Sequence, residues 1–244
     1  MPVFISSLKN AVGVLMLDSF TLYFASIAVM TVMTLLNFLT WRTNKHVPGT
    51  LLYIFYPLLL LAAIVSFALI GKIPDQIAIT LANNMMFLAS IVHCLSLSQF
   101  LNYHGRGLKF VCLFTALSAL LLVYFTFLQP SMRSRVYISD LQHIVEATFL
   151  LFIFIKYARK PYPNASIVYI IILTLVAASF ITRSLFMDDI AQQDAILNSW
   201  FNSLLFLNSV IAPMFYAAGM ALLCNERREL RLNKLTEKAH KDLE

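Results

Sequence analysis

The stretch TLLYIFYPLLLLAAIVSFALI, residues 50–70, holds 21 consecutive residues without an Asp, Glu, Lys or Arg. A helix rises about 1.5 Å per residue, so this stretch is long enough to cross the roughly 30 Å hydrocarbon core of a bilayer. Further stretches of this kind occur on both sides of it. Seven in all predict membrane spans, at residues 19–41, 50–70, 77–101, 109–127, 136–157, 165–187 and 200–224.

The composition of the whole chain agrees with this pattern. Of its 244 residues, 60% are hydrophobic and only 12% are charged, about half the charged fraction of a typical soluble domain. The net charge of +6 does not indicate a nucleic-acid partner, because the basic residues lie between the apolar runs and in the C-terminal segment. We therefore predict an all-α fold, an integral membrane bundle of seven transmembrane helices that binds no nucleic acid.

Lys and Arg predict the orientation of this bundle, because cytoplasmic connections are enriched in them. One set of alternate connections carries only four: Lys9, Lys72, Arg133 and Arg135. The other set, with the C-terminal segment, carries thirteen: Arg42, Lys45, Arg106, Lys109, Lys156, Arg159, Lys160, Arg227, Arg228, Arg231, Lys234, Lys238 and Lys241. The asymmetry places the N-terminus outside and the C-terminus in the cytoplasm of a multi-pass membrane protein.

The first 18 residues lack a basic start followed by a cleavage site, so they do not indicate a signal peptide. We expect residues 1–18 to form a periplasmic or surface-lying segment. Three cysteines, Cys94, Cys112 and Cys224, lie within apolar runs and lack the spacing of metal ligands. Met85 and His93 are too far apart along one helix for a copper site, so we expect a buried histidine and no cofactor.

Polar residues within spans are costly and often functional, and most of those here lie in the predicted outer half. Asp140 and Arg183 share one depth, about one turn from the outer surface. The candidate ligand-binding residues are Asn83, Asn84, Asp140, His143, Glu146, Arg183 and Asn202. An alternative is that these residues only pair between helices to fix packing, Asp140 with Arg183 first. Glu146 has no obvious charged partner at its depth.

No phosphate loop, serine elbow or two-histidine metal motif occurs. The predicted seventh span, residues 200–224, has no Lys for a retinal Schiff base. Two function classes remain. One is a receptor for a small molecule, amphiphilic or anionic. The other is a transporter or lipid-handling protein, in which Asp140, His143, Glu146 and Arg183 form a proton or substrate path.

Residues 17–106 carry a set of short motifs: LDSFT at 17–21, Trp41, VPG at 47–49, GKIPDQIAITLANN at 71–84, Phe100, and GR at 105–106. This region resembles the seven-helix N-terminal membrane region of bacterial GGDEF-type diguanylate cyclases, which also precedes some EAL phosphodiesterases and histidine kinases. The resemblance implies a sensor module of the bacterial inner membrane, joined to a cytoplasmic output domain that makes cyclic di-GMP.

The segment NERRELRLNKLTEKAHKDLE, residues 225–244, is charged and lacks Gly and Pro, so it predicts a helix. In the resembled cyclases the catalytic domain begins with a pattern like A-x-x-D-x-L-T-G-L. AHKD at 239–242 matches its Ala and Asp. We interpret residues 225–242 as a signalling helix and residues 243–244 as a possible cloning remnant. A native chain end is the alternative. This chain alone is then not an enzyme.

The predicted signalling helix carries a short apolar seam at a spacing of three and four, formed by Leu232, Leu235 and Ala239. The seam is too short to hold two chains together alone. It would set the register of a homodimer whose output domains also pair. The alternative is a solvated helix end, with its basic residues attracted to anionic lipid.

Overall fold

A computed structural model describes residues 19–185 and 200–242, with side chains from residue 24 to 185 and from 210 to 242. Within these ranges the chain is helical and has no strand. The elements are α2 (Ser19–Thr43), α3 (Thr50–Ala68), α4 (Asp75–Phe100), α5 (Arg106–Phe127), α6 (Met132–Ile153), the π-helical turn η1 (Phe154–Ala158), α7 (Pro163–Leu185) and α9 (Trp200–Lys241).

The six predicted spans that begin before residue 186 coincide with α2 to α7. Within the described residues, six helices are long and apolar enough to cross a membrane. A multi-pass helical membrane protein is therefore confirmed. The predicted seventh span, residues 200–224, forms the first part of α9, and its passage through a membrane stays a prediction. Residues 1–18 and 243–244 lie outside the described residues.

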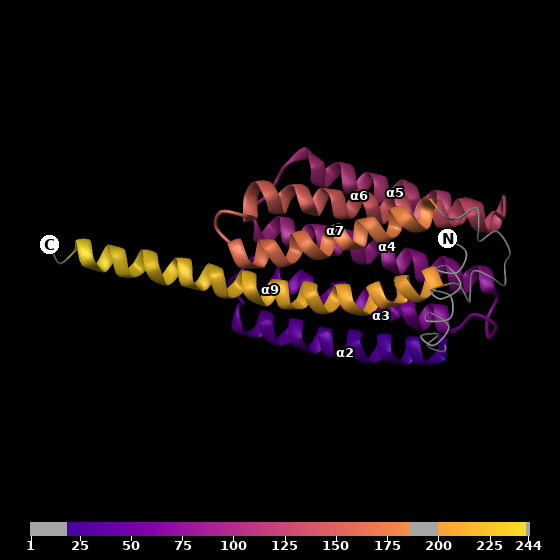
Figure 1. The fold of residues 1–244 in the computed structure, drawn as a ribbon, viewed down its shortest axis with the longest axis horizontal. Helices are drawn as coiled ribbons and strands as arrows, with labels where there is room; N and C mark the ends of the chain where they lie inside the picture. The colour runs from indigo at the N-terminus through magenta and orange to yellow at the C-terminus, as the bar shows by residue number, and fades with distance from the viewer. Residues whose placement is uncertain (1–18, 186–199, 243–244) are drawn as a thin grey trace, which may run out of the picture.

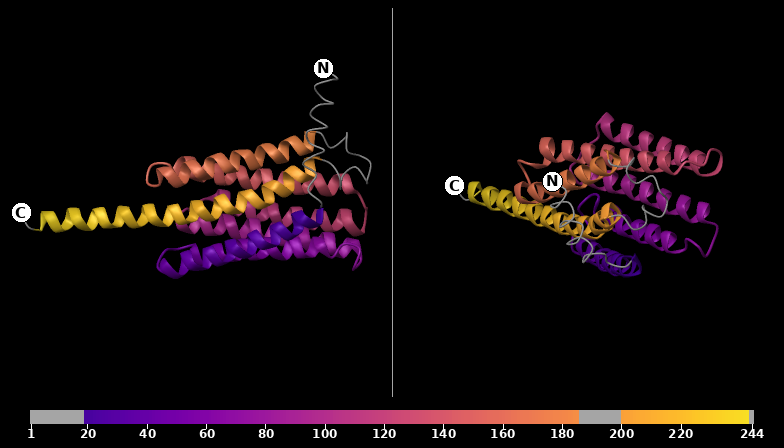
Figure 2. Two further views of the ribbon diagram at one scale, coloured as in Figure 1. Left: turned by 60° about the horizontal axis from the view of Figure 1, so that its bottom comes forward. Right: turned by 45° about the vertical axis from the view of Figure 1, so that its right-hand side comes forward.

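Figures 1 and 2 show the helices side by side in one bundle, and their contacts arrange them as a closed ring. Each of α2 to α7 packs against the next in the chain, and α9 packs against both α7 and α2 and so closes the ring. A further contact joins α4 to α6 across the ring. Residues of α4 and α6 therefore face the centre, and the polar side chains they carry can meet there.

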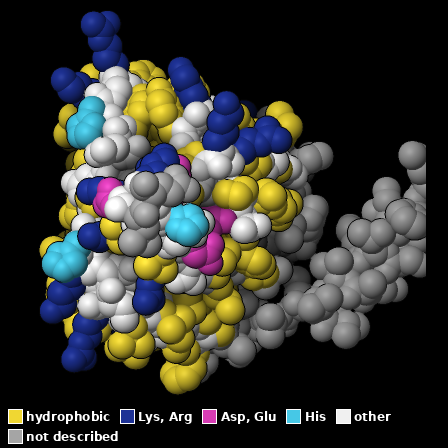
Figure 3. All heavy atoms as spheres, turned by 90° about the vertical axis from the view of Figure 1, so that its left-hand side faces the viewer, with side chains coloured by type: hydrophobic (Ala, Val, Ile, Leu, Met, Phe, Trp, Pro, Cys, Tyr) yellow, Lys and Arg dark blue, Asp and Glu magenta, His cyan; other side chains and the backbone are white. Residues whose placement is uncertain are grey.

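The connections alternate between two ends of the ring (Figure 1). Residues 43–50, 100–106 and 158–163 lie at the end from which α9 projects, and residues 68–75 and 127–132 lie at the other. The thirteen basic residues of the predicted cytoplasmic side thus belong to one end. Figure 3 shows Lys and Arg side chains around the rim of that end.

Large apolar side chains cover the outside of the ring. On α5, Leu113 is 72% exposed and Leu120 is 69% exposed, with Leu117 between them. Buried positions, in contrast, include Ser90, His93, Asp140 and many other polar residues. An apolar exterior around a polar centre fits a lipid environment, in which polar groups must pair inside the protein.

Gly49 allows α3 to begin close to α4. Its φ of 85° lies in the left-handed region that glycine adopts without steric cost. The Ser96 hydroxyl donates to the Gly49 carbonyl at 2.7 Å, and a Cβ at position 49 would press on the Ser96 carbonyl. This contact fixes the register between α3 and α4, and therefore which α4 side chains face the centre.

Candidate functional site

The predicted outer-half pair is present. Arg183 Nε of α7 lies 3.3 Å from Asp140 Oδ2 of α6, and the Ser184 hydroxyl donates to the same oxygen at 3.0 Å. The Asp140 side chain is fully buried, whereas the Arg183 side chain keeps 19% exposure. Asp140 Oδ1 is buried without a partner among the described residues. Arg183 thus has a matched counter-charge and holds α6 and α7 together.

The two predicted asparagines of α4 bond to their own helix. Asn83 Nδ2 donates to the Ile79 carbonyl and Asn84 Nδ2 to the Thr80 carbonyl, each at 2.8 Å. Both side chains are half-buried. For Asn202 the structure describes only the backbone, within α9, so its predicted contact lies outside the described side chains.

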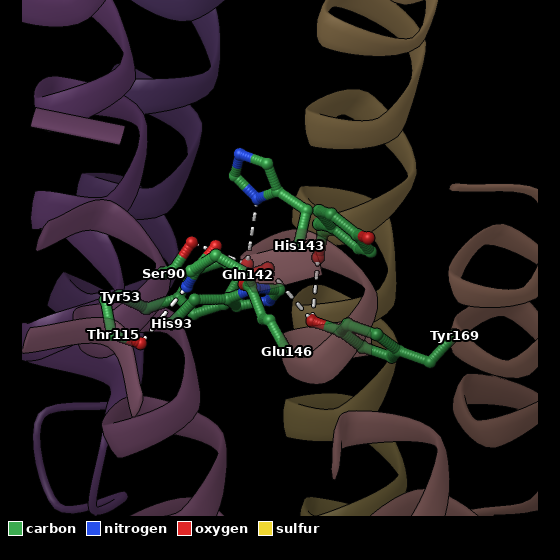
Figure 4. A network of polar contacts seen from close by, with 9 residues as sticks. Tyr53, Ser90, His93, Thr115, Gln142, His143, Glu146 and Tyr169 are labelled. Carbon is green, nitrogen blue, oxygen red and sulfur yellow. Dashed lines mark hydrogen bonds and ion pairs between the residues drawn. The ribbon is translucent and has the colours of Figure 1, made fainter. Parts of the chain in front are cut away.

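The other two predicted residues, His143 and Glu146, belong to a separate central cluster with His93. Glu146 Oε1 lies 3.1 Å from His93 Nδ1 on α4, and Oε2 lies 3.4 Å from His143 Nδ1, one turn earlier on α6. The Ser90 hydroxyl donates to Oε2 at 2.5 Å. Figure 4 shows Glu146 between these groups. These donors offset the desolvation cost of a buried carboxylate.

We name Glu146, His93 and His143 the central triad. The sequence showed no obvious charged partner for Glu146 at its depth, and in the structure two ionisable imidazoles lie beside it. The triad is also not sealed. The side chains of His143 and Glu146 keep 10% and 11% exposure, whereas that of His93 keeps 1%. In both histidines Nε2 is buried and lacks a hydrogen-bond partner among the described residues.

Aromatic rings enclose both imidazoles. His93 stacks on Tyr56 of α3 with ring centroids 4.4 Å apart, and the Tyr216 ring of α9 lies 4.8 Å away. His143 stacks on Phe180 of α7 at 4.7 Å. Ring faces are electron-rich and attract cations. Each imidazole therefore lies between a carboxylate and an aromatic face.

Tyrosine hydroxyls link three helices beside the triad. Tyr169 of α7 donates to the Tyr216 carbonyl of α9 at 3.0 Å. The Tyr53 hydroxyl of α3 lies 2.9 Å from the Tyr169 hydroxyl. Since the Tyr169 proton is directed to Tyr216, Tyr53 donates to Tyr169. On α6, Gln142 donates to the Thr115 hydroxyl of α5 at 3.1 Å. Five helices thus meet through polar contacts around the triad.

Two adjacent residues of α9, Glu226 and Arg227, bind to α7 and α4 at the end of the bundle from which α9 projects. The buried Glu226 accepts from the amides of Asn164 and Ala165 at 2.9 and 3.4 Å, where an anion stabilises the first turn of α7. Arg227 donates to the Phe100 carbonyl at the end of α4 at 3.0 Å and lies over the Phe100 ring. Beyond this point α9 is exposed on all sides, Leu232, Leu235 and Ala239 included.

Sequence reasoning missed His93 and the tyrosines as site residues. His93 was expected to be a buried histidine with a satisfied hydrogen bond, and its Nδ1 does bond to Glu146. His93 could have been identified as a site residue because it is an ionisable residue within an apolar run. The tyrosines gave no such signal, because aromatic residues are frequent throughout the spans.

Within the described ranges no group of His, Cys, Asp or Glu side chains, the central triad included, has an arrangement that could hold a metal ion. Cys94, Cys112 and Cys224 are free thiols. Comparisons with protein-family models, curated proteins and solved structures give no match to this chain. The arrangement itself therefore carries the functional argument.

Proposed function

We propose that this chain is the membrane sensor domain of a bacterial signalling protein. A small ligand binds among the polar residues of the outer half and centre of the bundle. Binding shifts the packing of the helices, and α9 passes that shift to a cytoplasmic output domain. In such a sensor the ligand acts by favouring one of two helix arrangements.

The observation that carries this proposal is the continuity of α9. One helix of 42 residues closes the ring, presents Tyr216 to the central triad and then extends beyond the bundle. A change in its tilt or rotation at Tyr216 is transmitted along a hydrogen-bonded rod. Glu226 and Arg227 add contacts to α7 and α4 at the point where the rod leaves the bundle.

The pairing of Asp140 with Arg183 bears on the ligand. An arginine without a counter-charge would require an anion, but Arg183 has Asp140 at 3.3 Å. The surrounding helices offer mostly apolar surface. A neutral amphiphilic molecule, with a polar group for Asp140 Oδ1 or Asn83 and an apolar tail, therefore fits this site better than a free anion.

The resemblance of residues 17–106 to sensor regions of GGDEF proteins supports a diguanylate cyclase as the output domain. The basic side chains at one end of the ring support an inner-membrane protein whose C-terminus is cytoplasmic. The exposed seam of Leu232, Leu235 and Ala239 is available to a second copy once output domains bring two chains together.

A fusion experiment tests the signalling role. A GGDEF domain placed after Asp242 is compared with versions that carry two or seven extra residues between Glu229 and Leu230, beyond the last contact with the bundle. Two residues turn the following helix by about 200°, whereas seven return it to within about 20° of its original face. We expect altered cyclic di-GMP production from the two-residue insertion and near-original production from the seven-residue control. Equal production from all three would show that α9 is a passive tether.

A transporter is the second candidate, and the central triad favours it specifically. Four ionisable residues, Asp140, His143, Glu146 and Arg183, lie on or beside α6, as in proton paths. Vesicles that contain the purified protein distinguish the two functions. Flux of protons or substrate that is abolished by Glu146→Gln would support a transporter. If the vesicles show no such flux, the sensor proposal is favoured.

A further inference from the structure

The central triad contains one carboxylate and two imidazoles within contact distance. When Glu146 is ionised, both Nδ1 atoms donate to it, because a carboxylate only accepts hydrogen bonds. The triad then has a net charge of −1 with both imidazoles neutral, 0 with one protonated and +1 with both protonated. In a low-dielectric centre an unbalanced charge is costly, so the charge states of the three groups depend on one another.

The side chains of the two histidines differ in exposure. His143 keeps 10% exposure of its side chain, and its Nε2 has no hydrogen-bond partner among the described residues. His93 is sealed and is enclosed by Tyr56 and Tyr216. Glu146 lies between the two imidazoles. Because both Nδ1 atoms already carry a hydrogen, an added proton binds at an Nε2 atom, which in both imidazoles is buried and has no hydrogen-bond partner among the described residues.

From this geometry we propose that Glu146, His93 and His143 form a proton-binding site whose occupancy controls the position of α9. The net event is the uptake of one proton from water, which raises the charge of the triad by one. This inference rests on the proposed sensor function and names the proton as one of its ligands. It also assigns His93, on α4, as the group through which the site acts.

Titratable groups of the neighbouring helices surround the triad. From α3, Tyr53 and Tyr56 face His93. From α4 and α5, Cys94 interacts with Glu146 and with Cys112. From α6 and α7, Asp140 interacts with His143 and is paired with Arg183, while Tyr169 bonds to Tyr53. From α9, Tyr216 faces both His93 and Glu146. The tyrosines and thiols carry no charge near neutral pH, and Asp140 with Arg183 is balanced.

The contact between His93 and Tyr216 links the site to α9. Their ring centroids are 4.8 Å apart, within the range in which an imidazolium is attracted to an aromatic face. Protonation of His93 draws the Tyr216 ring, and with it α9, toward α4. Loss of the proton removes that attraction. Since α9 is one continuous helix, the change reaches Leu230 and the residues beyond.

Histidine titration tests the proton site directly. The chain has five histidines, and His46, His104 and His240 are exposed. Replacing these three by Gln leaves only His93 and His143, whose ring nitrogens are followed by ¹⁵N NMR in lipid nanodiscs between pH 5 and pH 8. We expect at least one of them to titrate. Adding Glu146→Gln should lower the imidazolium fraction at a given pH about tenfold or more, since an adjacent opposite charge favours the charged form by about one to three pH units.

Two results would overturn the inference: no titration of either histidine in this range, or an identical titration in the Glu146→Gln variant. If that variant does not fold, Ser90→Ala is the second test, because it removes only the hydroxyl that donates to Glu146. It leaves more of the carboxylate charge for the imidazoles and should raise the imidazolium fraction at a given pH, by a smaller factor. An unchanged titration in Ser90→Ala would then count against the site.

Movement of α9 is measured independently, as the distance between spin labels placed at the exposed positions Lys109 and Lys234. We expect the distance distribution to change between pH 8 and pH 5, and to lose that change in His93→Gln. Titration without movement would contradict control of α9. The cyclic di-GMP fusion can fail while the histidines still titrate, in which case the sensor proposal fails and proton binding stands. If the fusion responds to the insertion but neither histidine titrates, the sensor proposal stands and proton binding fails.

Discussion

Tyr53 and Tyr169 lie 116 positions apart in the chain, and their hydroxyls meet at 2.9 Å in the centre of the bundle. Both side chains are buried, at 1% and 0% exposure. Because Tyr169 donates onward to the Tyr216 carbonyl, the two tyrosines connect α3 and α7 to the helix that leaves the bundle. Removing these hydroxyls one at a time tests how much their hydrogen bonds contribute to the stability of the bundle.

Tyr169→Phe should lower the stability by about 1–3 kcal/mol, because it leaves the buried Tyr53 hydroxyl without its acceptor. The double variant Tyr53→Phe with Tyr169→Phe should lose less than Tyr169→Phe alone, since no orphaned hydroxyl remains. Thermal unfolding in one detergent compares the variants. A double variant that loses the sum of both single effects would show that the hydroxyls do not act as a pair.

Gly219→Ala should also destabilise the bundle, by about 1–3 kcal/mol for an overpacked contact. A Cβ on Gly219 would lie 2.6 Å from a ring carbon of Tyr169, so α9 would have to move away from α7. The neighbouring Ala218 is exposed, and Ala218→Leu is the matched control, expected to unfold like the parent. A stable Gly219→Ala variant would mean that the ring shifts freely.

Glu226→Gln should weaken the attachment of α9 to α7 by about 1 kcal/mol, because it removes the negative charge at the first turn of α7. Hydrogen exchange of the Asn164 and Ala165 amides should become several-fold faster. The exposed Glu229 is the control, and Glu229→Gln should leave these amides unchanged. Equal exchange in both variants would exclude a capping role for Glu226.

Arg183→Ala should cost about 3 kcal/mol or more, because it leaves the fully buried Asp140 without its counter-charge. Combining it with Asp140→Asn should recover part of this loss, since no unpaired charge remains. Thermal unfolding measures both variants. If the single and double variants are equally stable, the pair contributes no net stabilisation and Arg183 is free to serve a ligand.

Reporter fusions test the orientation of the chain. A reporter after Asp242 should be active only as a cytoplasmic reporter, because thirteen of the basic residues belong to the end from which α9 projects. A reporter within residues 129–131, at the opposite end, should be active only as a periplasmic reporter. Periplasmic activity after Asp242 would reverse the orientation and remove the proposed output domain from the cytoplasm.

The sequence by itself determined the helical class and the six candidate spans of α2 to α7. Residues 50–68 form a helix because a run of this length in lipid must satisfy its own backbone hydrogen bonds. The pairing of Asp140 with Arg183 was also foreseeable, because both residues lie about one turn from the same surface. The extension of α9 followed from the helix-forming residues that precede Asp242.

The tertiary structure alone decided which faces of the helices meet. His93 and Glu146 are 53 positions apart. Their polarity indicates that both face the interior, but neither span indicates which residue of the other it will meet. In a soluble protein, apolar periodicity marks the side that faces inward. Here the lipid and much of the protein interior are both apolar, so apolar residues occur on every face of a span, and the rotation of the helices is fixed by packing and by interhelical hydrogen bonds. Closure of the ring by α9 between α2 and α7 has the same cause, and it brings Tyr216 to the triad.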